Sequence, residues 1–252
     1  GLVDSDSFDG GFSETTTATF GANFYAGIFY DDDGGNDRDD NLSTGYDFGI
    51  ALNTSFTGED SLDIAIDSGN PTPSTMSADV MGFDSGGALT VDGVTYTFPV
   101  GGATMMVGDA TDISAAFTGA CLYSSFTDYT PDDCGTGSSI GVTGKAVTAA
   151  ISYDFDNGFS VAGGISSPED EILGKSADIY GLNAAYTTDS YGLALGYATD
   201  DGGASADTTT WGFQGYYSFD LADLSVGYES QESGGTDKTG YFVGLTFPEV
   251  GP

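Results

Sequence analysis

The sequence predicts an all-β protein whose strands follow one another as an antiparallel, up-and-down transmembrane β-barrel. Residues 145–165, 179–197 and 211–228 each read as a β-hairpin, with two runs of alternating residues joined by a short turn that contains Asp. Tyr or Phe stands near the strand ends, as in membrane barrels. No apolar stretch approaches the roughly 20 residues of a membrane helix, so a place in a membrane requires strands that satisfy one another's hydrogen bonds.

Each of these hairpins has two different faces. In the first, Val147, Ala149, Ile151 and Tyr153 share one face, and the alternate positions are small or polar. A soluble β-sandwich alternates too, but its exposed face carries many Lys, Thr and Glu. Here the second face is mostly Gly, Ala, Ser, Thr, Asn and Asp, which favours the barrel and a water-filled interior. The apolar members are Tyr180, Leu182, Tyr191, Leu193, Leu195 and Tyr197 in the second hairpin, and Trp211, Phe213, Tyr217, Leu224, Val226 and Tyr228 in the third.

The chain reads as one domain. Its 252 residues suit one large barrel or two ordinary domains, but the hairpin pattern runs nearly from end to end without a boundary. Residues 1–11 are small and acidic and are interpreted as a linker or frayed N-terminus. Residues 12–252 are expected to form the barrel.

The charge balance excludes several classes of function. The chain has 39 Asp and Glu, 4 Lys and Arg and no His, for a net charge of −35. Nucleic-acid binding needs clustered basic residues that are missing. Without His there is no ordinary proton shuttle near neutral pH and no Ser-His-Asp triad, so an enzyme is not expected and no organic cofactor is implied.

The first strand is expected over residues 15–30, followed by an acidic run over residues 31–41. Hard cations bind clustered carboxylates, so this run could hold calcium weakly. It does not match the EF-hand loop, however, and a solvated surface loop is the favoured interpretation. The candidate calcium ligands are Asp31, Asp33, Asp37 and Asp39.

A clear hairpin is expected over residues 46–70, with its turn at residues 57–60. Its apolar positions are in phase on one face, and Asp47, Asp63 and Asp67 fall on the other. If the barrel interpretation holds, these acids point inward and make the wall electronegative.

A second, tight hairpin is expected around Asp92-Gly93, because this dipeptide between alternating runs signals a type I′ turn. With it, the chain is expected to hold about 12 to 14 strands; bacterial barrels of this kind have an even number.

Three segments carry a resemblance to a known family. Residues 53–70 read NTSFTGEDSLDIAIDSGN, residues 119–168 begin GACLYSSFTDYTPDDCGTG, and residues 241–252 read YFVGLTFPEVGP. They resemble the major outer-membrane porins of cyanobacteria, particularly of marine picocyanobacteria. The resemblance implies a trimeric barrel of about 16 strands with a water-filled channel, which passes inorganic ions and small solutes across the outer membrane of a Gram-negative, cyanobacterial cell. The family is also linked to iron uptake.

The sequence departs from that family at both ends. Members usually begin with an S-layer-homology module and a helical linker, which are absent here, and continue past the EVGP segment into further strands. Barrel closure within residues 12–252 is therefore expected to be incomplete at the C-terminus.

Both cysteines, Cys121 and Cys134, lie in the least strand-like stretch, residues 119–139. In an exported β-protein such a pair is expected to form a disulfide, worth roughly 3 kcal/mol by chain entropy; two free thiols are the alternative. A stapled loop that enters the lumen would form a negative constriction, whereas one that projects outward would form a cap or a trimer contact. The acids concerned are Asp128, Asp132 and Asp133.

The function expected from these features is that of a general diffusion porin. Carboxylates on the channel wall would concentrate cations and repel anions. Two alternatives remain: an exported acidic structural or adhesive β-protein of the cell surface, and a carbohydrate-selective porin. The second would use aromatic rungs such as Tyr216 and Phe242 together with Arg, but the chain has only Arg38.

Overall fold

A computed structural model describes residues 15–27, 43–69, 87–123, 133–136, 147–169, 178–202 and 205–247. Nearly all regular structure in these ranges is β-strand, which confirms the predicted all-β class. The short 3₁₀-helices η2 (Ile113–Ala116) and η3 (Asp133–Gly135) are exceptions. None of the helices in the described ranges is long and apolar enough to span a bilayer.

The strands form an antiparallel sheet in which each strand neighbours the next along the chain. The sheet has 12 strands in the described residues, at the lower end of the predicted number. They are β1 (Thr16–Gly27), β2 (Ser43–Thr54), β3 (Ser61–Gly69), β4 (Thr90–Val100), β5 (Ala103–Asp109), β6 (Val147–Asp154), β7 (Phe159–Ser167), β8 (Ile179–Thr187), β9 (Tyr191–Asp200), β10 (Thr208–Ser218), β11 (Asp223–Ser233) and β12 (Thr236–Thr246).

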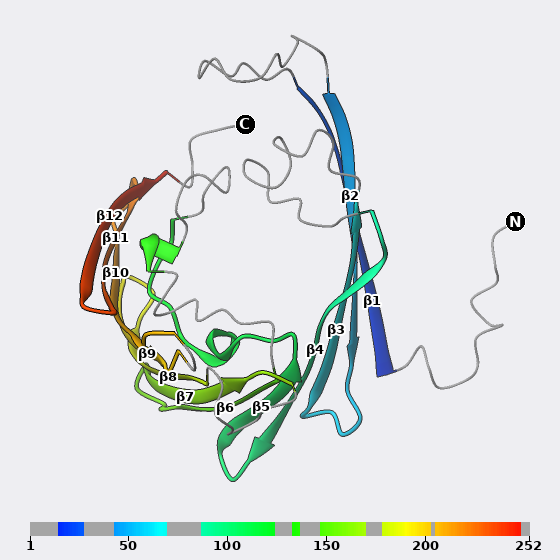
Figure 1. Ribbon diagram of the computed structural model, residues 1–252, viewed down its shortest axis with the longest axis horizontal. Coiled ribbons are helices and arrows are strands. Elements are labelled where there is room, and N and C mark those ends of the chain that lie inside the picture. Colours follow the sequence, from blue (N-terminus) through cyan, green and yellow to red (C-terminus); the bar gives the residue numbers. More distant parts are fainter. Residues whose placement is uncertain are drawn as a thin grey trace, which may run out of the picture. The chain divides into compact units, whose positions relative to one another are not determined.

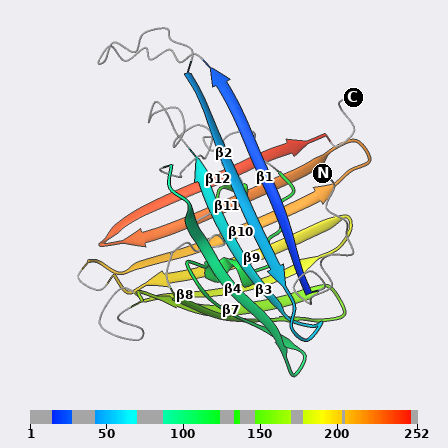
Figure 2. The ribbon, with the colours of Figure 1, turned by 90° about the vertical axis from the view of Figure 1, so that its right-hand side faces the viewer.

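The described residues divide into two compact units, the first ending at Val94 and the second beginning at Thr95, inside β4. In the first unit, β1, β2 and β3 run side by side (Figure 2). Phe20 pairs with Ile50, which in turn pairs with Ile66, so one face of these three strands is apolar. The predicted strand over residues 15–30 is confirmed as far as the described residues reach.

Asp60 organises the turn between β2 and β3. Its carboxylate oxygen Oδ1 accepts hydrogen bonds from the backbone N–H groups of Phe56 and Thr57, at 2.9 and 2.7 Å. The hydroxyls of Ser55 and Thr57 donate to the same oxygen. Because one buried acid satisfies these donors, the turn begins before the predicted residues 57–60, and Phe56 lies in it rather than on the strand.

The hairpin predicted at Asp92-Gly93 is wrong. Strand β4 runs through this dipeptide, and the chain reverses at Gly101 and Gly102, whose φ angles are 58° and 92°. A type I′ turn needs positive φ at both central residues, which glycine adopts without strain. The alternation of Val94, Tyr96, Phe98 and Val100 also continues in phase beyond Asp92, so the sequence holds a strand where the turn was expected.

In the second unit, strands β6 to β12 curve around a segment that joins β5 to β6 (Figure 1). We call residues 110–123 and 133–136 of this connection the inner segment. The buried apolar side chains gather between the inner segment and the sheet, where Ile113 packs against Met106, Ala150 and Ala198. A second cluster joins Ala120 to the sheet and consists of Ala120, Ala185 and Ala194 with Tyr216.

Candidate functional site

Each unit has a polar face that is a candidate site by itself, and the two faces differ in what lies on them. In the second unit the face opposite the apolar one is small and polar, and the inner segment lies on it. The burial of Ile113 requires this small face: a Cβ added at Gly181 would come within 2.9 Å of the Phe117 ring, and one at Gly164 within 2.8 Å of Ile113. The glycines therefore make room for the inner segment.

Polar side chains of four strands bind the backbone of the inner segment. The Thr148 hydroxyl on β6 donates to the carbonyl of Thr111. On β8, the Asn183 Oδ1 accepts from the N–H of Thr118 at 2.9 Å, and its Nδ2 donates to the Thr118 carbonyl at 3.2 Å. The side chains of Gln214 on β10 and Ser225 on β11 accept from the N–H groups of residues 120 and 122, at 2.8 and 3.0 Å.

The predicted disulfide between Cys121 and Cys134 is present, with the two Cα atoms 5.9 Å apart. Cys134 is buried against Gly227 of β11, where the backbone of η3 occupies the space that a side chain would need. Nearby, the Tyr123 ring meets the edge of the Phe242 ring on β12, with centroids 5.0 Å apart. The described part of the loop thus lies on the polar face of the sheet. Asp128 and Asp132 lie outside the described residues, so a negative constriction stays a prediction.

The alternation of the strands places Asn183, Gln214, Ser225 and Thr148 on the small, polar face but does not predict that they bind the inner segment. The sequence signal for this role is a carboxamide among Gly and Ala residues. Such a side chain has both a hydrogen-bond donor and an acceptor and can therefore bind the backbone of a segment that covers the face.

In the first unit, Asp47, Asp63 and Asp67 share one face, opposite the apolar side chains of the same strands. The register pairs Gly49 with Asp67 and Asn53 with Asp63. Asp67 leans over Gly49, since a Cβ added there would lie 2.9 Å from its Oδ1.

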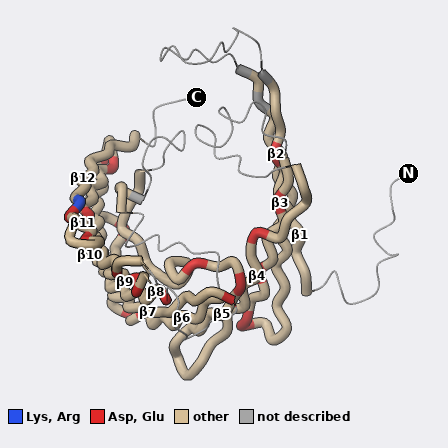
Figure 3. Tube along the Cα trace, in the orientation of Figure 1, with Lys and Arg blue, Asp and Glu red and all other residues tan. Residues whose placement is uncertain are grey.

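Carboxamides accompany two of these acids. The Asn23 side chain donates to Asp47 at 3.2 Å, and that of Asn53 to Asp63 at 2.6 Å. The Oδ1 of Asp47 is buried without a hydrogen bond. Figure 3 shows acidic positions along the strands of both units and few basic ones. Because Asp47, Asp63 and Asp67 share one face of β2 and β3, that face is electronegative.

The remaining predicted site residues lie outside the described part of the chain. These are Asp128 and Asp132, the side chain of Asp133, and the calcium candidates Asp31, Asp33, Asp37 and Asp39. Within the described ranges no three His, Cys, Asp or Glu side chains are grouped as metal ligands.

The outer, apolar face of the second unit is exposed and carries rows of aromatic rings. Strands β8, β9 and β10 each bear two aromatic residues six positions apart on this face, or about 20 Å along a strand. Leu193 and Leu195 lie between them on β9 and are half exposed. The paired residues are Tyr180 and Tyr186, Tyr191 and Tyr197, and Trp211 and Tyr217.

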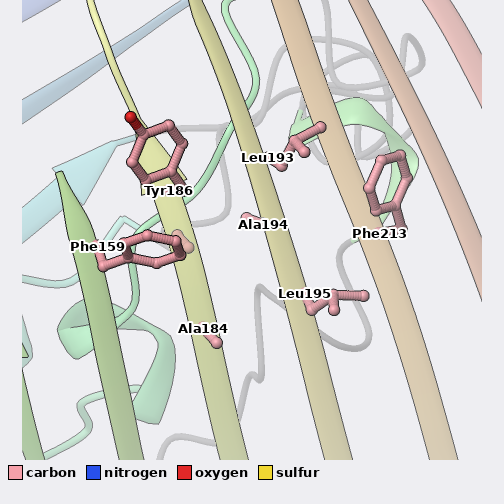
Figure 4. A pocket seen from close by; sticks show the side chains of 8 residues that line it. Phe159, Ala184, Tyr186, Leu193, Ala194, Leu195 and Phe213 are labelled. Atoms are coloured by element: carbon pink, nitrogen blue, oxygen red, sulfur yellow. The ribbon is translucent and has the colours of Figure 1, made fainter.

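Aromatic rings gather most densely at one end of the hairpins. The Phe159 and Tyr186 rings lie 4.6 Å apart, and those of Tyr217 and Phe219 4.7 Å apart. Between the rings, a shallow apolar hollow of about 350 Å³ opens on the outer face. Figure 4 shows Phe159 and Tyr186 on one side of it and Leu193, Leu195 and Phe213 on the other, with Ala184 between.

No family model and no curated protein matches this chain. Among solved structures, it is similar to a variant of the Rhodopseudomonas blastica porin, with 14% identity, a TM-score of 0.48 and coverage of 93% of this chain and 91% of that one. It is also similar to a loop-deletion variant of OmpT, an outer-membrane protein of Vibrio cholerae, with 16% identity, a TM-score of 0.45 and coverage of 92% and 87%.

Proposed function

We propose that the protein is a general diffusion porin of a Gram-negative outer membrane, which passes inorganic ions and small hydrophilic solutes and prefers cations. The observation that carries this proposal is the division of the strands into an exposed apolar face and a small, polar face. A water-soluble protein would bury the first of these faces.

The apolar face has the composition of a lipid-facing surface. Large side chains such as Leu182, Leu195 and Val243 are more than half exposed, at 59%, 54% and 70%. Outer-membrane barrels carry an apolar band about 25 Å tall between two girdles of aromatic residues. From Trp211 to Phe219 the chain advances eight residues, or about 26 Å along the strand direction. For a strand tilted by about 40° this is about 20 Å along the membrane normal, so the aromatic rows lie toward the two edges of such a band.

The polar faces would form the wall of the water-filled channel. In this wall Asp47, Asp63 and Asp67 act as fixed negative charges, and low-dielectric surroundings focus their field on the passing ion. Cations are thereby concentrated and anions repelled. Salt screens these charges, so the preference weakens as the ionic strength rises.

The inner segment would narrow the channel. It covers the polar face of β6–β11 and brings Ala115, Gly119 and Leu122, all exposed, to the side that the sheet leaves open. Asp128, Asp132 and Asp133 belong to the same disulfide loop. We propose that they add negative charge where the inner segment narrows the channel.

The resemblance to cyanobacterial porins supports a homotrimer in a cyanobacterial outer membrane. Passive diffusion requires neither a cofactor nor catalysis, which agrees with the absence of His from the sequence. Calcium at the acidic run of residues 31–41 remains a proposal that melting with and without calcium would test.

The two alternatives fit the structure less well. Sugar-selective porins need accessible aromatic rungs, but Phe242 packs against Tyr123 and the Tyr216 hydroxyl donates to the carbonyl of Thr188 at 2.6 Å. A surface-layer or adhesive protein would pack its apolar face against another sheet. It would stay soluble without detergent and migrate alike on a denaturing gel before and after heating, whereas a barrel needs detergent and migrates differently when unheated.

Single-channel recording in a planar bilayer tests the proposal. Stepwise currents are expected, and under a salt gradient the reversal potential should have the sign of cation preference and shrink at higher salt. Folded, detergent-purified protein that gives no current steps, or that prefers anions, would contradict it.

A further inference from the structure

We propose that Gln214 is the positioning residue of the inner segment, with Asn183 and Ser225 beside it, and that the Cys121–Cys134 disulfide does not hold the segment in place. The channel would then keep its narrow point whether the disulfide is intact or reduced. This inference rests on the proposed channel function for its conductance readout only.

Gln214 joins the same two stretches of chain as the disulfide. Its Oε1 accepts from the N–H of Ala120, one residue before Cys121, at 2.8 Å. Its Nε2 donates to the hydroxyl of Thr136, two residues after Cys134, at 2.7 Å. The side chain is only 1% exposed, so water does not compete for either bond and the carboxamide ties both ends of the loop to β10.

Asn183 and Ser225 attach the inner segment on either side of Gln214, and their contacts fall at every second residue of the segment. The N–H groups of residues 118, 120 and 122 are held by Asn183, Gln214 and Ser225, on β8, β10 and β11. Alternate N–H groups of an extended chain point to the same side. Residues 118–122 of the inner segment are therefore an extended stretch that crosses the strands and pairs with their side chains instead of with a neighbouring backbone.

The disulfide and the carboxamide act on different states of the protein. A disulfide stabilises mainly by restricting the unfolded chain, whereas a buried hydrogen bond fixes a position in the folded one. Removing the acceptor of the Ala120 N–H leaves a buried donor without a partner, and the segment can recover that bond only by moving into water. Cutting the disulfide leaves all of these hydrogen bonds in place.

The test compares five proteins: the wild type, C121A/C134A, Gln214→Met, the combination of all three changes, and the control Gln231→Met. Met keeps the length of Gln and removes its hydrogen bonds. Gln231→Met is the matched control, because Gln231 lies on β11 and donates to Thr210 within the sheet, at 3.4 Å, rather than to the inner segment. Two quantities are measured on each folded protein: single-channel conductance, and amide hydrogen exchange of a peptide that covers residues 117–123.

We expect C121A/C134A and Gln231→Met to keep the conductance and exchange protection of the wild type. Gln214→Met should raise the conductance about twofold, because the narrowest cross-section sets ionic flow, and should speed exchange at Ala120 about tenfold or more. The combined variant should behave as Gln214→Met does, since the disulfide joins the two stretches of the loop to each other and not to the sheet. Should Gln214→Met not fold, Ser225→Ala replaces it, with faster exchange expected at Leu122.

The proposal is overturned if C121A/C134A alone raises conductance and loses protection, or if Gln214→Met behaves as Gln231→Met does. Failure of the channel function is distinguishable from either result. In that case no variant conducts, and the exchange of residues 117–123 still decides whether Gln214 or the disulfide positions the segment.

Discussion

The polar faces of the two units are built from the same alternating strands, yet they carry different chemistry. On β2 and β3 the face bears Asp47, Asp63 and Asp67, all partly or fully exposed. On β6 to β11 the part of this face that the inner segment covers bears uncharged side chains, and Asn183 and Gln214 there are 5% and 1% exposed; the acids of the same face, such as Asp154 and Glu229, are exposed or partly exposed. Burying a charge without a partner is costly, whereas a neutral amide can satisfy a covering backbone. The acids therefore lie where the polar face is open to solvent. The side-chain amides lie where the inner segment covers the polar face.

The largest expected effect comes from placing a charge on each face. Ala194 lies on the covered face against Ala120 and Ala185, and Ala51 lies exposed on the polar face of β2. Ala194→Arg should lower the free energy of unfolding by about 3 kcal/mol or more, through overpacking and a buried charge. Ala51→Arg should change it by no more than about 0.5 kcal/mol. Urea unfolding in lipid vesicles, followed by the fluorescence of the single Trp211, measures both; equal losses would erase the difference between the faces.

A smaller loss of stability is expected from replacing Asn183 or Asn53, which lie on the polar faces of the second and the first unit. Asn183→Leu leaves the N–H and carbonyl of Thr118 without their partner and should cost about 2 kcal/mol. Asn53→Leu removes exposed bonds to Ser61 and Asp63, for which less than about 1 kcal/mol is expected. The same unfolding experiment ranks them, and a reversed order would mean that the inner segment is not held by β8.

The smallest expected effect is a change in the ion selectivity of the channel that leaves the stability of the protein unchanged. Changing Asp47, Asp63 and Asp67 together to Asn should lower the cation-to-anion permeability ratio roughly twofold. The control changes the same number of charges in three exposed hairpin turns of the second unit, at Asp156, Asp189 and Asp220, and should leave the ratio nearly unchanged. Reversal potentials under a salt gradient measure both; if the turn variant has the larger effect, selectivity lies outside the wall of β1–β3.

The two faces of the hairpins could be predicted because a period of two fixes the side of every residue once one is known. This placed Asp47, Asp63 and Asp67 together, as the register has them. The disulfide followed from two cysteines in one loop.

The covering of the second polar face could not be predicted. A row of Gly and Ala, such as Gly181 and Ala194, is equally suited to a bare channel wall and to a wall that a segment packs upon. The turn at Asp92-Gly93 failed for a related reason: local turn preference competed with the alternation that continues to Val100, and pairing along the whole strand decided the outcome.

Cysteine accessibility at two adjacent residues tests the central claim most directly, namely that the polar face lines a water-filled path and the apolar face contacts lipid. Ala51 and Leu52 lie on opposite faces of β2, and both native cysteines are paired, so Ala51→Cys or Leu52→Cys supplies the one free thiol. During single-channel recording, a cationic, water-soluble thiol reagent should reduce the current of Ala51→Cys and leave that of Leu52→Cys unchanged. Current reduction in Leu52→Cys alone, or in neither variant, would contradict the account.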